Sequence, residues 1–160
     1  MTKAIYPGSF DPMTAGHIGI AERAARLFET LFICVYDTPS KNLLFTTAER
    51  VEFAQDATQH ISNVTVTTYS RELTVNLARK LDATAMVRGL RSGADFVTEL
   101  ELAQMNRRLA PEIESVFIMT SAEHQFLSSS LLKEAASLGG DISALVTPAI
   151  AEALQKKLLS

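Results

Sequence analysis

The sequence has no tryptophan, a single cysteine and only three histidines among its 160 residues. One cysteine, Cys34, excludes an intramolecular disulfide framework and is typical of a protein in a reducing compartment. No apolar run reaches the length that a membrane-spanning helix needs. The first residues hold no long apolar segment of the kind found in secretory signals. We therefore expect a cytoplasmic protein with no membrane partner.

An excess of positive charge is also lacking. Fifteen lysines and arginines stand against 18 acidic residues, for a net charge of −3, so the chain as a whole is not built to bind nucleic acid. What is present is 47% hydrophobic and 21% charged residues, an ordinary composition for a globular protein. We expect a single domain over residues 1–160 with a sizeable core.

Apolar, β-branched runs alternate with segments of helical periodicity along the whole chain. This pattern predicts an α/β fold, a Rossmann-like doubly wound five-stranded parallel sheet with helices on both faces and further helices at the C-terminus. The first strand is expected to break at Pro7-Gly8. Strands are predicted at 4–6, 31–36, 64–69, 83–87 and 115–119, and helices at 16–28, 46–59, 73–81, 92–109, 128–138 and from 147 onward.

Ligands of such sheets bind beyond the carboxyl ends of the strands, where the strand order reverses. The residues after each predicted strand should therefore share one site. They include four side chains that are or can become cationic, and we see no carboxylate cluster among them, which suits a ligand with several phosphates. These segments are Ser9 and His17, Lys41, Leu73-Thr74, Arg88 and Arg91, and 120–130.

The glycine-punctuated turn from the first strand into a helix is a ready anion site, because backbone N–H groups and the helix dipole point at the ligand. His17 at the helix start can donate a hydrogen bond to a phosphate, and Arg88 and Arg91 can hold phosphates in fork geometry. Ser128–Ser130 offers hydroxyls and N–H groups at a second helix start. Nucleotidyl transfer needs such positioned donors and little covalent work.

Each of these residues also has a purely structural interpretation. His17 alone could be a capping histidine, and Ser128 would cap a helix in any case. Glu99 could belong to a solvated or ion-paired helix face. Asp11 could order an Asx turn before Pro12, and Cys34 is expected to be a small buried hydrophobic residue.

The run Gly8-Ser-Phe-Asp-Pro-Met-Thr-Ala-Gly-His17 resembles the signature of the nucleotidyltransferase superfamily with a T/H-x-G-H motif. Three further motifs narrow the resemblance: Pro39-Ser-Lys41, Arg88-Gly-Leu-Arg91 and Phe126-Leu-Ser-Ser-Ser130. With their spacing, the chain resembles the bacterial phosphopantetheine adenylyltransferase family. This resemblance implies adenylyl transfer from ATP to 4′-phosphopantetheine, giving dephospho-coenzyme A and pyrophosphate, the penultimate step of coenzyme A biosynthesis.

The resemblance also implies the roles of individual residues. His17, Lys41 and Arg91 would be catalytic, and Ser9, Lys41, Thr74 and Arg88 would bind phosphopantetheine. No protein group would hold a metal, since Mg²⁺ would be held by the ATP phosphates and water. Feedback inhibition by coenzyme A and a homohexamer are implied as well. The ATP-binding set would be Ser9, Phe10, His17, Gly89, Leu90, Arg91, Glu99, His124, Gln125, Phe126, Leu127, Ser128, Ser129 and Ser130.

The sequence departs from the family pattern at Ser9, where threonine is usual, at His124-Gln125, where an aromatic residue followed by serine is common, and at Thr74, where an apolar residue is common. Two alternatives stay open. One is a cytidylyl- or nicotinamide-mononucleotide-type transferase with the same chemistry. The other is a nucleotide-binding regulatory module or flavodoxin-like carrier without turnover, which the fold alone would permit.

Overall fold

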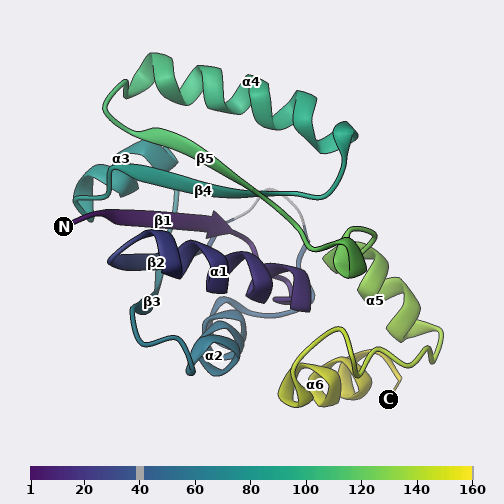
Figure 1. Ribbon diagram of the computed structural model, residues 1–160. Helices are drawn as coiled ribbons and strands as arrows, with labels where there is room; N and C mark the ends of the chain where they lie inside the picture. The colour runs from purple at the N-terminus through teal and green to yellow at the C-terminus, as the bar shows by residue number, and fades with distance from the viewer. Residues whose placement is uncertain (39–41, 160) are drawn as a thin grey trace.

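The computed structural model describes residues 1–38 and 42–159. It consists of a five-stranded parallel sheet with helices on both faces (Figure 1), which confirms the predicted fold class. The elements are β1 (Lys3–Gly8), α1 (Ala15–Leu27), β2 (Thr30–Tyr36), α2 (Thr47–Thr58), β3 (Val64–Tyr69), α3 (Thr74–Lys80), β4 (Ala85–Leu90), α4 (Gly93–Leu109), β5 (Glu114–Met119), the 3₁₀ turn η1 (Ala122–His124), α5 (Ser129–Ser137) and α6 (Pro148–Leu158).

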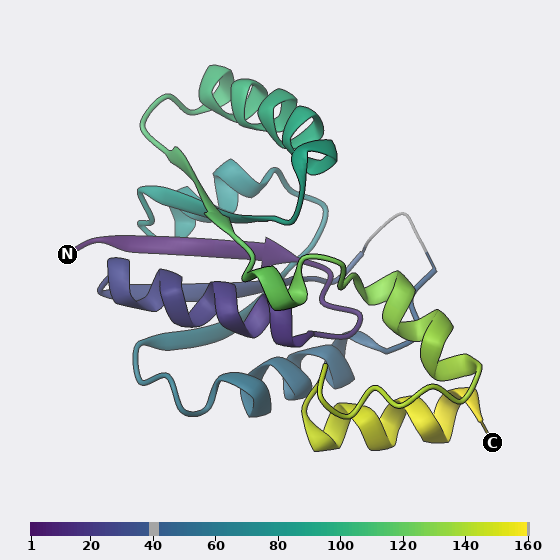
Figure 2. The same ribbon diagram turned by 45° about the vertical axis from the view of Figure 1, so that its right-hand side comes forward.

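The strands lie in the order β3-β2-β1-β4-β5, so the chain reverses direction across the sheet between β1 and β4. Helices α1 and α2 cover one face, and α3 and α4 cover the other (Figure 2). Successive β1 side chains divide between these faces, since Ala4 and Tyr6 belong to the larger core and Ile5 belongs to the smaller one. Cys34 is fully buried in the smaller core, as expected. No helix in the described part of the chain is long and apolar enough to cross a bilayer.

The sheet opens between the central strand β1 and its neighbour β4. Strand β1 pairs with β2 over six residues, but it pairs with β4 only at Ala4 and Ile5. The expected break at Pro7-Gly8 is wrong, because both residues continue the ladder with β2, opposite Cys34 and Val35. Pro7 has no N–H to donate, and the ladder with β4 has already ended before it. The divergence of β1 and β4 leaves room between their carboxyl ends.

Most helix boundaries follow the predicted signals. Thr46 and Glu49, three residues apart at the predicted start of α2, form a capping box. Thr147 caps α6 with Pro148 in its first turn, and α5 ends just before Gly139, whose φ of 80° favours glycine. Strand β4 was predicted to end at Val87 but continues to Leu90, because its last residues pair with β5.

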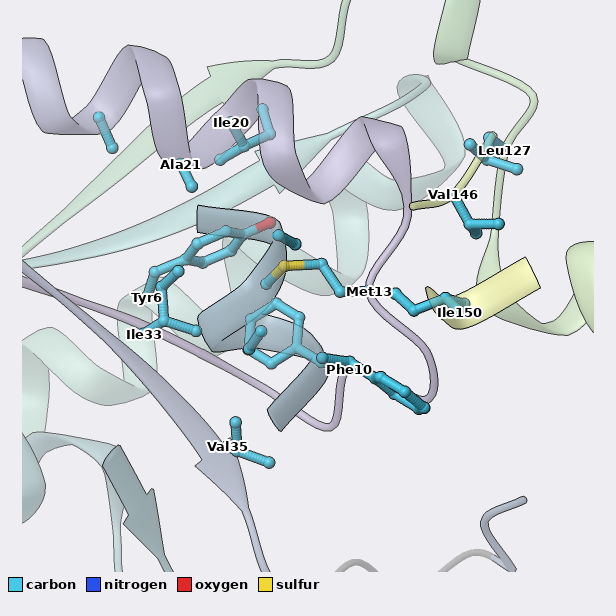
Figure 3. Packing of buried hydrophobic residues seen from close by; sticks show 14 of the residues in the cluster. Tyr6, Phe10, Met13, Ile20, Ala21, Ile33, Val35, Leu127, Val146 and Ile150 are labelled. Atoms are coloured by element: carbon cyan, nitrogen blue, oxygen red, sulfur yellow. The ribbon is translucent and has the colours of Figure 1, made fainter. Parts of the chain in front are cut away.

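The turn that joins β1 to α1 is packed into the larger core (Figure 3). Phe10 and Met13 from this turn are buried, and they belong to the same core cluster as Leu127 and Ile150 of α6. A Cβ at Gly8 would lie 3.1 Å from the Phe10 ring, so the close approach of this ring favours glycine there. Residues of the C-terminal segments thus pack in the same core as the turn, so the turn is held in place rather than forming a loose loop.

Candidate functional site

A cavity of about 490 Å³ lies at the carboxyl ends of β1 and β4, where the strand order reverses. This is the location that the strand-order rule predicts. Its walls come from the β1–α1 turn, the end of β4, the start of α4 and the start of α5. Eleven of the predicted site residues line it: Ser9, Phe10, His17, Arg88, Gly89, Arg91, Glu99, Leu127, Ser128, Ser129 and Ser130.

The β1–α1 turn is held in an unusual backbone conformation. Phe10 has a φ of 48°, in the left-handed region that few residues with a side chain adopt. Its ring packs edge-on against the rings of Tyr6 and His17, at centroid distances of 5.3 and 5.2 Å. Phe10 is only 4% exposed, so its ring belongs to the core. The backbone of the turn lies along the cavity.

His17 is held by the residue that caps its own helix. The Thr14 side chain accepts a hydrogen bond from the His17 backbone N–H, and the Thr14 backbone N–H donates to His17 Nδ1 at 3.0 Å. Because Nδ1 accepts, the proton of the neutral ring lies on Nε2. Burial, and secondarily the charge of Arg91, lowers the pKa of His17 to about 4. Near pH 7 the ring is therefore a neutral donor.

Arg88 is fixed by a carboxylate from α4. Its Nη2 and Nε donate to the two carboxylate oxygens of Glu99, at 2.7 and 2.9 Å, and its Nη1 donates to the Pro7 carbonyl at 3.4 Å. Burial alone would lower the pKa of Arg88, but the hydrogen bonds and charge of Glu99 outweigh burial and raise it. Arg88 was predicted to follow β4, but it lies within this strand, opposite Phe117 of β5.

Arg91 at the end of β4 is held in a similar way. The Asp95 carboxylate accepts from the Arg91 backbone N–H at 3.1 Å and lies 3.3 Å from Arg91 Nε. The spacing of Ser92 and Asp95 is that of a capping box for α4, but the Ser92 side chain makes no capping hydrogen bond. Asp95 accepts from the backbone N–H of Arg91 instead, so its carboxylate binds the arginine that precedes the helix.

The start of α5 forms the opposite wall. Ser128 caps this helix by accepting from the Leu131 N–H at 3.1 Å, as predicted. Ser129 donates through its hydroxyl to the Pro12 carbonyl at 2.8 Å, which ties α5 to the β1–α1 turn. Ser128–Ser130 line the cavity at this helix start, and the backbone N–H groups of a helix N-terminus can serve an anion.

Two buried charged residues that the sequence did not single out as site residues hold these walls together. Asp11 is 3% exposed and accepts from the Leu44 and Phe45 N–H groups at 3.0 and 2.9 Å, and from Lys133 Nζ at 2.6 Å. Arg50 is 2% exposed and donates to the carbonyls of Ser9 and Tyr36, among others. Asp11 therefore links three segments, and the interpretation of it as a local Asx-turn residue is too narrow.

The charges at the cavity are compensated. Three cations line it in the described part of the chain, and each is paired with a carboxylate that also lines it. The acids stand in separate pairs, and the described residues hold no group of three or more acidic, histidine or cysteine side chains that could bind a metal ion. The pairs are Arg88–Glu99, Arg91–Asp95 and Lys133–Asp11.

Several predicted residues lie elsewhere. Thr74 begins α3, the helix that follows β3 and packs against β1, and it does not line the cavity. Leu90 is 8% exposed within β4, and its carbonyl accepts from the Thr120 N–H. His124, Gln125 and Phe126 also do not line the cavity, and Lys41 lies outside the described residues. Sequence reasoning missed these lining residues: Tyr6, Pro7, Gly8, Asp11, Thr14, Gly16, Ile20, Asn42, Asp95, Thr120 and Lys133.

The sequence is similar to those of known nucleotidyltransferases. Residues 5–135 match the cytidylyltransferase-like family model. A phosphopantetheine adenylyltransferase from Roseiflexus sp. (strain RS-1) is 50% identical over 98% of this chain and 97% of that protein. Another from Heliobacterium modesticaldum is 50% identical over 98% of this chain and 93% of its own length.

A likeness of fold extends to more distant proteins. The solved structure of a Plasmodium falciparum nicotinic acid mononucleotide adenylyltransferase, in complex with NaAD, has a TM-score of 0.70. It shares 15% sequence identity, with 98% of this chain and 95% of that chain covered. This structure supports the fold alone, whereas the relatives at 50% identity also establish the family. On that evidence the chain belongs to the cytidylyltransferase-like family and, within it, to the phosphopantetheine adenylyltransferases.

Proposed function

We propose that this protein transfers the adenylyl group of ATP to 4′-phosphopantetheine, which gives dephospho-coenzyme A and pyrophosphate. This is the penultimate step of coenzyme A biosynthesis. The observation that carries the proposal, beside family membership, is a neutral His17 at the strand switch point with its Nε2–H free of the Thr14 contact. A neutral histidine donor next to two fixed arginines suits a phosphorus centre that gains negative charge on its oxygens.

The reaction needs no general base. A phosphate oxygen of phosphopantetheine attacks the α-phosphorus of ATP, and the bond from that phosphorus to the oxygen bridging to the β-phosphate breaks. The nucleophile is already an anion, so the protein has to align the two substrates and stabilise charge. His17 would donate from Nε2 to an oxygen of the α-phosphate, and Arg91 would stabilise the phosphates of the nucleotide beside it.

The two substrates would occupy different parts of the site. Ser9 and Arg88 at the ends of β1 and β4 would hold the phosphate of phosphopantetheine, with Lys41 and Thr74 further along its path. The ATP-binding set includes the start of α5 at Ser128–Ser130. Gly89 would let the nucleotide approach the backbone. Phe10, Leu90, Arg91, Glu99 and residues 124–127 complete the proposed ATP-binding set.

We also propose that Mg²⁺ enters with ATP. The described residues contain no group of three or more histidine, cysteine or acidic side chains that could hold a metal ion. The acids that line the cavity are each engaged by a cation, whereas the hydroxyls of Ser9 and Ser128–Ser130 suit the water shell of a hydrated ion. The ion supplies charge neutralisation on the phosphates.

A homohexamer and inhibition by coenzyme A belong to the same proposal. Helix α4 buries only Asn106 and exposes large apolar side chains, an arrangement that fits contact with further copies. Size-exclusion chromatography with light scattering would give the assembly directly. We place the protein in the cytoplasm, which its single buried cysteine suits. The exposed side chains on α4 are Phe96, Val97, Leu100, Leu102, Met105 and Leu109.

The deciding experiment measures pyrophosphate release from Mg·ATP with and without 4′-phosphopantetheine. CTP replaces ATP as one control, and nicotinamide mononucleotide replaces phosphopantetheine as another. Release that requires both ATP and phosphopantetheine would establish the reaction. Release with CTP or nicotinamide mononucleotide instead would favour a related transferase. ATP binding without any release would favour a regulatory module.

A further inference from the structure

Lys133 is a cation of the cavity for which the proposed reaction has no role yet. It lies on α5, four residues after Ser129 and three after Ser130, and these spacings place side chains on the same face of a helix. All three residues line the cavity. The Lys133 side chain is 25% exposed, so it remains accessible from the cavity.

Asp11 holds the Lys133 ammonium but does not depend on it. The distance from Nζ to Oδ2 of Asp11 is 2.6 Å. The Asp11 carboxylate also accepts from two backbone N–H groups, those of Leu44 and Phe45, so it stays hydrogen-bonded without the lysine. An ammonium has three N–H donors. Among the described residues Asp11 is the one hydrogen-bond partner of Lys133 that the structure gives, which leaves donors for an incoming ligand.

We propose that Lys133 binds the phosphates of the nucleotide that leave as pyrophosphate. The inference rests on the proposed adenylyl transfer and deepens it. Lys133 shares its helix face with the serines that line the nucleotide side, and its charge adds to the positive end of α5. Asp11 fixes the ammonium at the wall before the ligand arrives. Less side-chain entropy is then lost when a phosphate oxygen binds.

The test measures binding of inorganic pyrophosphate to the full chain by titration calorimetry, with no nucleotide present. Lys133→Met should weaken this binding about ten- to hundredfold, the range expected for a lost charged hydrogen bond. The matched control is Lys157→Met. Lys157 is similarly exposed at 33% and pairs with Glu49 at 2.9 Å, but it does not line the cavity. It should leave pyrophosphate affinity within about twofold of wild type.

A measurement on the unmodified protein covers the case in which the Met variant does not fold. Acetic anhydride labels accessible lysines, and mass spectrometry reads each site. Saturating pyrophosphate should slow acetylation of Lys133 and leave that of Lys157 unchanged. Unaltered labelling of Lys133, or a folded Lys133→Met variant that binds pyrophosphate as tightly as wild type, would overturn the proposal.

The two proposals can fail separately. Loss of pyrophosphate binding in Lys133→Met supports the lysine site even if the wild-type protein releases no pyrophosphate from ATP and phosphopantetheine, a result that would overturn the reaction. Conversely, normal turnover with pyrophosphate binding indifferent to Lys133 would leave the reaction intact and remove the lysine from it.

Discussion

His17 and two cations of the cavity, Arg88 and Lys133, are positioned in opposite ways. His17 is neutral and is held by Thr14, three residues earlier in the same helix cap. Arg88 and Lys133 are charged and are held by carboxylates 11 and 122 positions away in the sequence, whereas Arg91 pairs with Asp95 only four positions on. A local motif is enough to build the neutral donor, whereas Arg88 and Lys133 depend on contacts between different elements of the fold.

The difference has an energetic reason. Unpaired cations around one cavity would repel each other and would be costly to remove from water. Carboxylate partners stabilise the site before ligand arrives, and phosphates can later share the same donors. A neutral histidine needs no such compensation. The following variants test whether the local and the long-range contacts contribute as this comparison implies.

Replacing His17 with alanine should have the largest effect. The change removes one donor to the transition state, and loss of such a donor typically lowers turnover by about 10²–10³-fold. Pyrophosphate release under saturating substrates measures it. His60→Ala is the matched control, because His60 is 54% exposed and pairs with Glu22 away from the cavity. Near-wild-type turnover in the folded His17 variant would remove its catalytic role.

Glu99→Gln tests the contact between α4 and β4 that holds Arg88. The carboxylate is engaged by Arg88 in the empty site, so we expect the variant to release this arginine. The KM for phosphopantetheine should rise about tenfold, the lower range for a charged hydrogen bond. The KM for ATP should change less. Glu101→Gln on the exposed side of the same helix serves as the control.

The opposite pattern of KM changes would also be informative. If Glu99→Gln raised the KM for ATP and left that for phosphopantetheine unchanged, Glu99 would act on the nucleotide directly, as family resemblance implies. The role of Glu99 as the support of Arg88 would then be wrong.

Much of the fold followed from sequence patterns. The strands, the capping box at Thr46 and Glu49 and the site at the strand ends were all predictable, because local periodicity and caps determine them. The expected break at Pro7-Gly8 was wrong because a strand that has already separated from one neighbour tolerates proline. The short β4 was wrong because pairing with β5 extends it.

The partners of the cations were not predictable in this way. Glu99 and Asp95 lie one turn apart on α4 and look like ordinary helix acids in the sequence. Their roles depend on how α4 lies over β4, which is a tertiary property. Lys133 gave one weak signal, its spacing from Ser129 and Ser130, but its contact with Asp11 joins opposite ends of the chain.

Thr14→Val tests the local contact between Thr14 and His17, and it is a smaller change than removal of the histidine. The backbone N–H still donates to Nδ1, but the hydroxyl no longer caps α1, which should lower the free energy of unfolding by about 1 kcal/mol. Turnover should fall several-fold because the ring is less firmly held. Thr147→Val loses an equivalent cap on α6 without touching a histidine, so it should lose similar stability and keep its turnover. Equal turnover in both variants would contradict a positioning role for Thr14.

The last expected effect is a pH dependence of stability that originates at His17. The folded protein keeps the pKa of this ring at about 4, because of burial and the nearby Arg91 charge, against 6.5 for the unperturbed side chain. Between these values the unfolded chain binds a proton that the folded protein does not. The stability of the wild type should therefore fall as the pH decreases from about 6.5 to about 4.

Urea unfolding at several pH values in this window, compared between wild type and His17→Ala, isolates this contribution because His60 and His124 remain in both proteins. The difference in free energy of unfolding should shift steadily against the wild type as the pH falls, and it should level off near pH 4 where the folded ring also binds a proton. A constant difference across the window would mean that His17 titrates normally in the folded protein. The neutral donor would then not be a property built into the cap, and the contrast with the ion-paired cations would lose its basis.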